Sequence, residues 1–272
     1  MNRIVNNSKR AGAIKIVFLV MHKVVLLGTG NLAHHLFDAF TKSNSVSVVQ
    51  VFGRSAERLA YFKDRTKVTH KPENLLHADI YIIAVSDDAI HTVSQYIKNK
   101  KSIIAHCSGG MGLETLTEGS DRGVFYPLQS FSKGRKIDFS EVPLCIEGSS
   151  EIVLEKLISL GRTISQICVP INSKQRLAMH LAAVYTNNFT NHLLFKASQI
   201  CEENDLPFSL LMPLLKETVS KLGILSPYDA QTGPARRNDR KTQEKHMKII
   251  SNKQDREIYA LLSEAIQTTY GD

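Results

Sequence analysis

The residues Lys23-Val-Val-Leu-Leu-Gly28-Thr-Gly30-Asn-Leu-Ala33 decide the fold of this 272-residue chain. Their apolar run predicts a buried β-strand, and the glycines that follow predict a tight turn into a helix. The spacing G-x-G-x-x-A is typical of dinucleotide-binding units, in which the second glycine lets a pyrophosphate approach the backbone and the alanine lets the helix pack against the sheet. A purely structural turn is the alternative. We expect nucleotide binding by Gly28, Thr29, Gly30, Asn31 and Leu32.

Around this motif, apolar runs alternate with amphipathic stretches as far as residue 170. Strands are expected at 46–52, 79–85, 102–105, 123–126, 142–146 and 163–169. Helices are expected at 33–42, at 55–62, from Asp87 or Asp88 to 97, and at 150–160. Such alternation predicts a parallel sheet with helices on both faces. From Ser173 onward the pattern is helical, over 173–204, 207–222 and 254–269. The predicted fold class is therefore α/β: a doubly wound, mainly parallel Rossmann sheet followed by a smaller all-α domain.

We place the domain boundaries at 1–21 for an N-terminal extension, 22–170 for the nucleotide-binding domain and 171–272 for the helical domain. The extension resembles an export signal, because Arg3, Lys9 and Arg10 precede an apolar stretch. Lys15 interrupts that stretch, however, and no small-residue cleavage site follows. An appended segment ahead of Met21 is therefore favoured over an export signal.

Composition narrows the class of protein. With 43% hydrophobic and 22% charged residues the chain should fold, and it has no apolar run of about 18 residues that would cross a membrane. The four cysteines are scattered without a Cys-x-x-Cys pair, which predicts free thiols, no metal site and a cytoplasmic location. The net charge of +8 is spread along the chain. This distribution favours an enzyme with anionic ligands over a nucleic-acid-binding protein.

The end of the second expected strand indicates which dinucleotide binds. An enzyme that uses NAD carries Asp or Glu about 20 residues after the glycines, whereas this chain has Val51-Phe-Gly53-Arg54-Ser55. The Arg54 guanidinium and the Ser55 hydroxyl suit a 2′-phosphate. Gly53, Arg54 and Ser55 therefore predict NADP as the cofactor. A solvated arginine beside a helix cap is the alternative.

Two further strand ends supply candidate contacts, because ligands of open α/β sheets bind at the carboxyl edge. Val85 and Ser86 should line the path of the ribose and the nicotinamide. The next strand leads into His106-Cys-Ser108-Gly-Gly. We expect His106 beside the cofactor and Ser108 beside the substrate, although a structural turn with a hydrogen-bonded histidine explains this stretch equally well.

Five stretches together carry a family resemblance: Gly28 to Ala33, Ala84-Val-Ser-Asp-Asp-Ala-Ile90, His106-Cys-Ser-Gly109, the pair His180 and Asn188, and Gln231-Thr-Gly-Pro-Ala-Arg-Arg-Asn-Asp239. Over residues 23–270 the chain resembles Rossmann-like oxidoreductases whose helical part is called domain of unknown function 2520. These are similar to pyrroline-5-carboxylate reductase and to the 6-phosphogluconate dehydrogenase C-terminal-like superfamily. The resemblance implies an NADP-binding fold, an all-α second domain and a homodimer formed through that domain. It implies no particular substrate.

His180 interrupts an otherwise apolar helical stretch and is a candidate catalytic residue. It could exchange the substrate proton, because imidazole does so near neutral pH. An asparagine would orient the substrate: the resemblance favours Asn188, whereas about 100° per residue places Asn187 on the face of His180. Related proteins often use Lys-x-x-x-Asn on this helix, but Val184 stands four residues after His180. A core histidine bonded to backbone is the alternative.

The connector at 231–239 supplies the remaining candidates. Arg236 could clamp a substrate carboxylate, with Gln231 and Thr232 beside it, while Arg237 could pair with Asp239. A solvated loop is the alternative. These residues predict an NADP-dependent oxidoreductase that transfers a hydride between nicotinamide and a small, anionic carbonyl, imine or hydroxy metabolite. The alternative function is a non-catalytic NADP-binding sensor.

Overall fold

The computed structural model describes residues 21–271. Its packing divides the chain into two compact units, the first ending at Tyr185 and the second spanning Thr186–Asp272. The expected domain boundary at residue 170 stays a prediction, and the expected extension lies outside the described residues except for Met21. No helix within 21–271 is long and apolar enough to cross a membrane.

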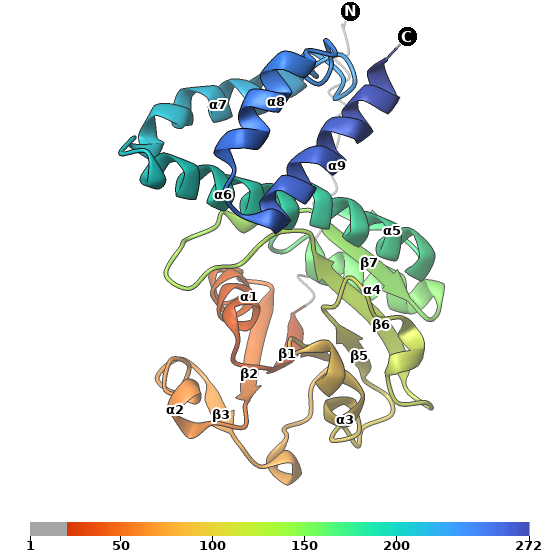
Figure 1. Cartoon of the computed structure of the whole chain (residues 1–272). Helices are drawn as coiled ribbons and strands as arrows, with labels where there is room; N and C mark the ends of the chain where they lie inside the picture. Colours follow the sequence, from red (N-terminus) through yellow and green to blue (C-terminus); the bar gives the residue numbers. More distant parts are fainter. Residues whose placement is uncertain (1–20, 272) are drawn as a thin grey trace, which may run out of the picture. The chain divides into compact units, whose positions relative to one another are not determined.

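The first unit is built on an eight-stranded sheet with the order β3-β2-β1-β4-β5-β6-β7-β8 (Figure 1). Neighbouring strands are parallel except for the antiparallel pair β6 and β7. The predicted α/β fold class, a mainly parallel sheet followed by helices, is therefore confirmed. The strands are β1 His22–Leu27, β2 Val46–Phe52, β3 Lys67–Thr69, β4 Ile80–Ile83, β5 Ile103–His106, β6 Asp121–Pro127, β7 Leu144–Gly148 and β8 Cys168–Pro170.

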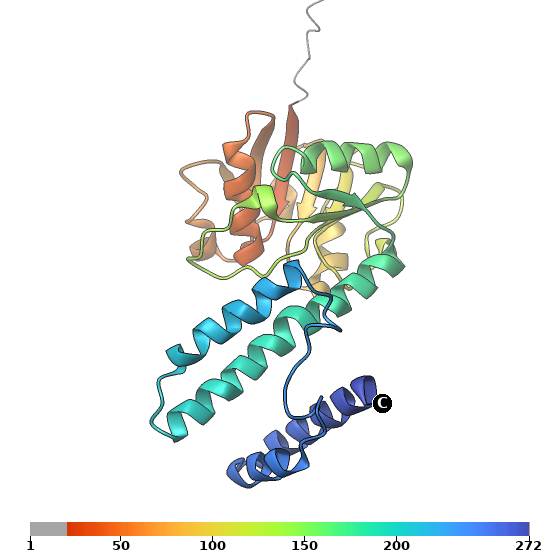
Figure 2. The ribbon, with the colours of Figure 1, turned by 90° about the horizontal axis from the view of Figure 1, so that it is seen from above.

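Helices cover both faces of this sheet (Figures 1 and 2). On one face lie α1 (Asn31–Lys42) and α4 (Glu151–Gly161), whose apolar side chains join one core cluster. On the other lies α3 (Ile90–Ser94), which belongs to a second cluster. Strand β1 divides its side chains between the two clusters because successive residues of a strand point to opposite faces. The expected helix at 55–62 is shorter, with α2 at Ala56–Leu59.

The expected long helix at 173–204 contains an irregular turn. It consists of α5 (Ser173–Ala183), a π-helical segment (Val184–Phe189) and α6 (Thr190–Glu203). A π-helix turns through fewer degrees per residue than an α-helix, because its hydrogen bonds join residues five apart. The α-helical geometry that placed Asn187 on the face of His180 therefore does not apply across this segment.

The second unit continues with α7 (Met212–Ser220), α8 (Arg240–Ile249) and α9 (Lys253–Tyr270). Figures 1 and 2 show α8 and α9 side by side, where Nδ1 of His246 lies 2.8 Å from the Tyr259 hydroxyl. Helix α8 was not among the expected elements. Asp239 caps it by accepting from the Thr242 N–H at 3.1 Å, and the ion pairs within 21–271 include none between Arg237 and Asp239.

Candidate active site

The glycine turn after β1 requires its first glycine. Gly28 has φ of +138°, which favours glycine, and a Cβ there would overlap the carbonyl oxygen of Ala84 at the end of β4. Its N–H also donates to the Phe52 carbonyl at the end of β2, at 2.9 Å. The absence of a side chain at Gly28 therefore lets the ends of three neighbouring strands approach one another.

The second glycine leaves room for a ligand. Gly30 is the N-cap of α1, and within the described residues no side chain caps this helix end. A Cβ built on Gly30 would meet no described atom within 4 Å. Open space thus lies beside the unpaired N–H groups and positive dipole end of α1, which is the environment that a pyrophosphate requires. These residues fit the phosphates of a dinucleotide.

The neighbours of Gly30 hold the turn in place. The side chain of Asn31 donates to the Phe131 carbonyl at 3.0 Å, which fixes the loop after β6 beside the first turn of α1. Leu32 packs against the core cluster on this face of the sheet. The backbone N–H groups of Asn31 and Leu32 can therefore bind a phosphate, while their side chains contact the rest of the protein.

The end of β2 lies against the glycine turn, as the expected adenosine site requires. A Cβ on Gly53 would overlap the Thr29 side chain, so only a glycine allows this approach. Arg54 is exposed, and the ion pairs of the described part of the chain do not include it. The Ser55 hydroxyl accepts from the Arg58 N–H at 3.4 Å and caps α2.

The end of β4 presents the other expected cofactor residues. Val85 is half-buried and Ser86 is exposed. Ser86 is the N-cap of a 3₁₀ turn, Asp87–Ala89, which leads into α3. Because the Ala84 N–H donates to the Leu27 carbonyl at the end of β1, at 2.7 Å, Val85 and Ser86 lie on the same carboxyl edge as the glycine turn.

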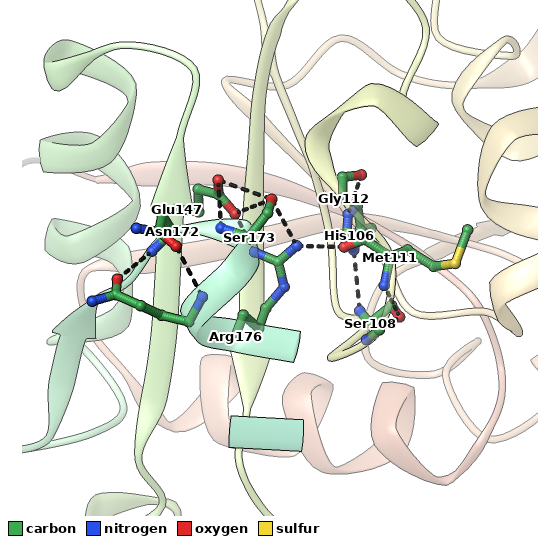
Figure 3. Close-up of polar contacts among 10 residues, drawn as sticks. His106, Ser108, Met111, Gly112, Glu147, Asn172, Ser173 and Arg176 are labelled. Atoms are coloured by element: carbon green, nitrogen blue, oxygen red, sulfur yellow. Dashed lines mark hydrogen bonds and ion pairs between the residues drawn. The ribbon is translucent and has the colours of Figure 1, made fainter. Parts of the chain in front are cut away.

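His106 supports the loop that follows β5. Its side chain is fully buried, its Nδ1 accepts from the Ser108 N–H at 3.1 Å, and its Nε2 lies 3.2 Å from the Gly112 carbonyl (Figure 3). These two bonds favour the neutral imidazole with the proton on Nε2. Burial lowers the pKa of His106 to about 4. The geometry favours the alternative interpretation, a structural turn with a hydrogen-bonded histidine.

Ser108 shapes the same loop. Its hydroxyl oxygen accepts from the N–H groups of Gly110 and Met111, each at 3.1 Å (Figure 3). The side chain is 9% exposed. Ser108 therefore holds the turn that carries Gly109, and its hydroxyl proton remains a donor for a ligand.

Gly109 brings this loop against two side chains from other elements. A Cβ at Gly109 would lie 2.7 Å from Nδ1 of His180 on α5 and 2.7 Å from Cζ of Tyr126 on β6. The Tyr126 hydroxyl is 3.2 Å from Nδ1 of His180. Burial raises the pKa of Tyr126, which keeps its phenol protonated. Gly109, Tyr126 and His180 form what we call the reaction cluster.

Tyr126 was not among the expected site residues. The signal was available, because Tyr126 ends the strand expected at 123–126 and a carboxyl strand end borders the ligand crevice. The core-histidine interpretation of His180 is also less favoured, because the side chain is half-buried and its Nδ1 lies beside a tyrosine hydroxyl instead of a backbone group.

The remaining expected residues belong to the second unit. Asn188 is exposed and lies in the π-helical segment. The Arg236 guanidinium donates to the Gln231 carbonyl and lies 5.1 Å from the centre of the Tyr270 ring. The Gln231 side chain donates to the Thr232 carbonyl at 2.8 Å. The connector is thus an ordered turn inside its own unit.

The sheet order and the glycine turn are those of a dinucleotide-binding protein of the Rossmann class. Residues 23–108 match the family model "NADP oxidoreductase coenzyme F420-dependent", and residues 142–266 match the model "Domain of unknown function (DUF2520)". A candidate NADP oxidoreductase of Bacteroides fragilis is 33% identical, with a TM-score of 0.84 over 92% of this chain and 99% of that one. The chain belongs to this family of NADP oxidoreductases, and the expected resemblance and the expected cofactor, NADP, are confirmed at that level.

More distant solved structures share the fold. An imine reductase from Myxococcus stipitatus, in complex with NADP⁺, is 14% identical with a TM-score of 0.66 over 92% of this chain and 96% of that one. A reductive aminase from Aspergillus terreus, in complex with NADPH and ethyl levulinate, is 13% identical. Its TM-score is 0.67 over 93% of this chain and 96% of that one. None of the curated proteins matches the sequence.

Proposed function

We propose that this oxidoreductase reduces a small C=N or C=O compound with NADPH, or runs the reverse reaction, at the carboxyl edge of its sheet. The observation that carries the proposal is the reaction cluster: a histidine and a tyrosine share a hydrogen bond beside a loop that follows β5. The bound nicotinamide would supply or accept the hydride. The protein would hold the substrate and exchange its proton.

His180 is the proton-exchanging residue in this proposal. Tyr126 contacts Nδ1, so Nε2 is the nitrogen that we assign to the substrate. A hydrogen bond at one ring nitrogen fixes the tautomer and therefore the role of the other. The Ser108 hydroxyl would donate to the substrate from the neighbouring loop. Val85 and Ser86 would line the path of the ribose and nicotinamide.

Contacts from the second unit stay part of the proposal. Asn188 would orient the carbonyl or imine, and Arg236 would bind a substrate carboxylate together with Gln231 and Thr232. The substrate would then be a small anion. Arg236 supports this role because it is exposed and a guanidinium has five N–H donors, more than its bond to Gln231 uses.

We also propose a cytoplasmic homodimer formed through the helical unit. Among the described residues of that unit, the buried apolar side chains are those of Cys201, Ala230 and Ala235. Large apolar side chains are exposed instead, including Phe195, Leu214 and Leu261. Exposed apolar area of this extent favours burial against a second copy. Light scattering should report twice the mass of one chain, and a monomer at micromolar concentration would contradict the proposal.

Oxidation of NADPH tests the reaction directly. Two proteins that share the fold are named an imine reductase and a reductive aminase, so cyclic imines and amine–ketone mixtures come first, followed by 2-oxo acids. His180→Ala should lower kcat by about 10²- to 10⁴-fold without changing the NADPH dissociation constant. His77→Ala, an exposed histidine before β4, is the matched control. Binding of NADPH without turnover of any compound would favour the sensor.

A further inference from the structure

Helix α5, which carries His180, is attached to the rest of the first unit by a buried arginine. Arg176 is the only buried residue of α5 and is 1% exposed. Its guanidinium donates to the Glu147 carboxylate on β7 and to the Met111 carbonyl, and it lies 3.2 Å from the Ser173 hydroxyl (Figure 3). The apolar side chains of Leu177 and Leu181 on the same helix are 55% and 57% exposed. Polar contacts therefore fix this helix.

The first turn of α5 is tied to the same carboxylate. Glu147 accepts from both the N–H and the hydroxyl of Ser173, each at 3.0 Å. Just before it, Asn172 and Gln175 form a capping box, with both hydrogen bonds at 2.9 Å (Figure 3). The start of α5 therefore has a defined position on β7.

The bond from Arg176 to the Met111 carbonyl also reaches the loop that carries Gly109 of the reaction cluster. Met111 belongs to the loop that His106 and Ser108 hold, and this loop presents Gly109 to His180. One guanidinium thus contacts the helix, β7 and the loop at once. His180 follows Arg176 by four residues, which places the two side chains one above the other on the helix.

Stability alone does not explain this arrangement. A buried ion pair is often no more stabilising than apolar side chains of the same volume. Nε of Arg176 is also buried without a hydrogen-bond partner in the described part of the chain, which is unfavourable. The geometry that the planar guanidinium imposes is the clearer gain, because its fork joins two acceptors at fixed separation.

We propose that Arg176, together with Glu147, is a positioning residue that holds His180 against Tyr126 and Gly109. The catalytic use of this position rests on the proposed function, whereas the positioning itself does not. The two claims are therefore separable by experiment.

The test is the variant Glu147→Gln/Arg176→Met in the full-length protein. It removes the charges of Glu147 and Arg176 together, so that neither charge is left buried without its partner. The amide introduced by Glu147→Gln keeps an oxygen that can accept from Ser173. Long-range ¹H–¹⁵N spectra report the two ring nitrogens of His180, assigned by their loss in His180→Ala. In the double variant the His180 ring should no longer keep one tautomer. We therefore expect the ¹⁵N chemical shifts of its two ring nitrogens to move towards each other. Arg176→Lys, which can reach Glu147 or Met111 but not both, should give an intermediate shift and serves if the double variant fails to fold.

Ser102→Ala is the matched control, because it removes a buried hydrogen bond to the Ala78 carbonyl just before β5, distant in the chain from both α5 and β7. It should lower the melting temperature and leave the His180 resonances unchanged. Folded Arg176 variants with wild-type His180 resonances would overturn the positioning role. With an imine substrate in hand, the double variant should lose about 100-fold in kcat at unchanged NADPH affinity. Shifted resonances with wild-type kcat would instead contradict the function proposed for His180.

Discussion

The carboxyl edge of the sheet has two halves that are built in opposite ways. Around Gly28 and Gly30 the surface is backbone, and its donors are available because side chains are absent. Around Gly109, Tyr126 and His180, side chains from a loop, a strand and a helix contact one another. The half around the glycine turn depends on open space beside the backbone, and the half around the reaction cluster depends on contacts between side chains. Substitutions should therefore act sterically in one half and chemically in the other.

The two glycines of the turn give the largest contrast in stability. Gly28→Ala forces an unfavourable φ and an overlap with Ala84, and should lower the free energy of unfolding by about 3 kcal/mol or more. Gly30→Ala enters open space at a φ of −81°, so we expect a loss under about 1 kcal/mol. Urea denaturation measures both. Equal losses would contradict the steric account of this half.

His106 should make stability depend on pH. Its pKa is about 4 in the folded chain, below the ordinary value of about 6.5 in the unfolded chain. The unfolded state therefore binds more protons between these values. The stabilisation is fully present above pH 6.5 and is lost as the pH falls towards 4, a change of about 3 kcal/mol. His106→Gln should flatten this part of the profile, and a slope that survives the substitution would refute the assignment.

Arg54 should determine the choice of dinucleotide. The variant Arg54→Ala removes a charged hydrogen-bond donor to the 2′-phosphate. It should weaken NADPH binding by about 10- to 100-fold and leave NADH binding nearly unchanged. Arg58→Ala, an exposed arginine on α2, is the matched control for net charge. Fluorescence titration measures the dissociation constants of NADPH and NADH for the wild-type protein, Arg54→Ala and Arg58→Ala. Equal losses for NADPH and NADH in Arg54→Ala would show that Arg54 does not contact the phosphate.

Tyr126→Phe should have the smallest effect of the series. It removes one hydrogen bond to His180, worth about 1 kcal/mol, so kcat should fall about fivefold with the NADPH dissociation constant unchanged. Tyr81→Phe removes a comparable hydroxyl that donates to the Leu76 carbonyl at 2.8 Å, away from the reaction cluster. A kcat in Tyr126→Phe that matches this control would mean that Tyr126 does not orient the imidazole.

The same contrast explains what the sequence could predict. The phosphate half depends on glycines at fixed spacing beside an apolar strand, so Gly28 to Leu32 could be named in advance. The reaction cluster depends on contacts between residues far apart in the chain, and Tyr126, Glu147 and Arg176 were missed. A buried arginine looks like a solvated one in a sequence. The π-helical segment could not be anticipated either, since α-helical periodicity was the only guide to the faces of that helix.

Calorimetric titration with NADPH decides whether the glycine turn binds the cofactor, with wild-type protein and Gly30→Ala compared under the same conditions. We expect saturable binding of one NADPH per chain by the wild-type protein. Binding by Gly30→Ala should be much weaker, because its fold should be intact but its added methyl group occupies the phosphate space. No heat with the wild-type protein, or equal affinity in the two proteins, would contradict it.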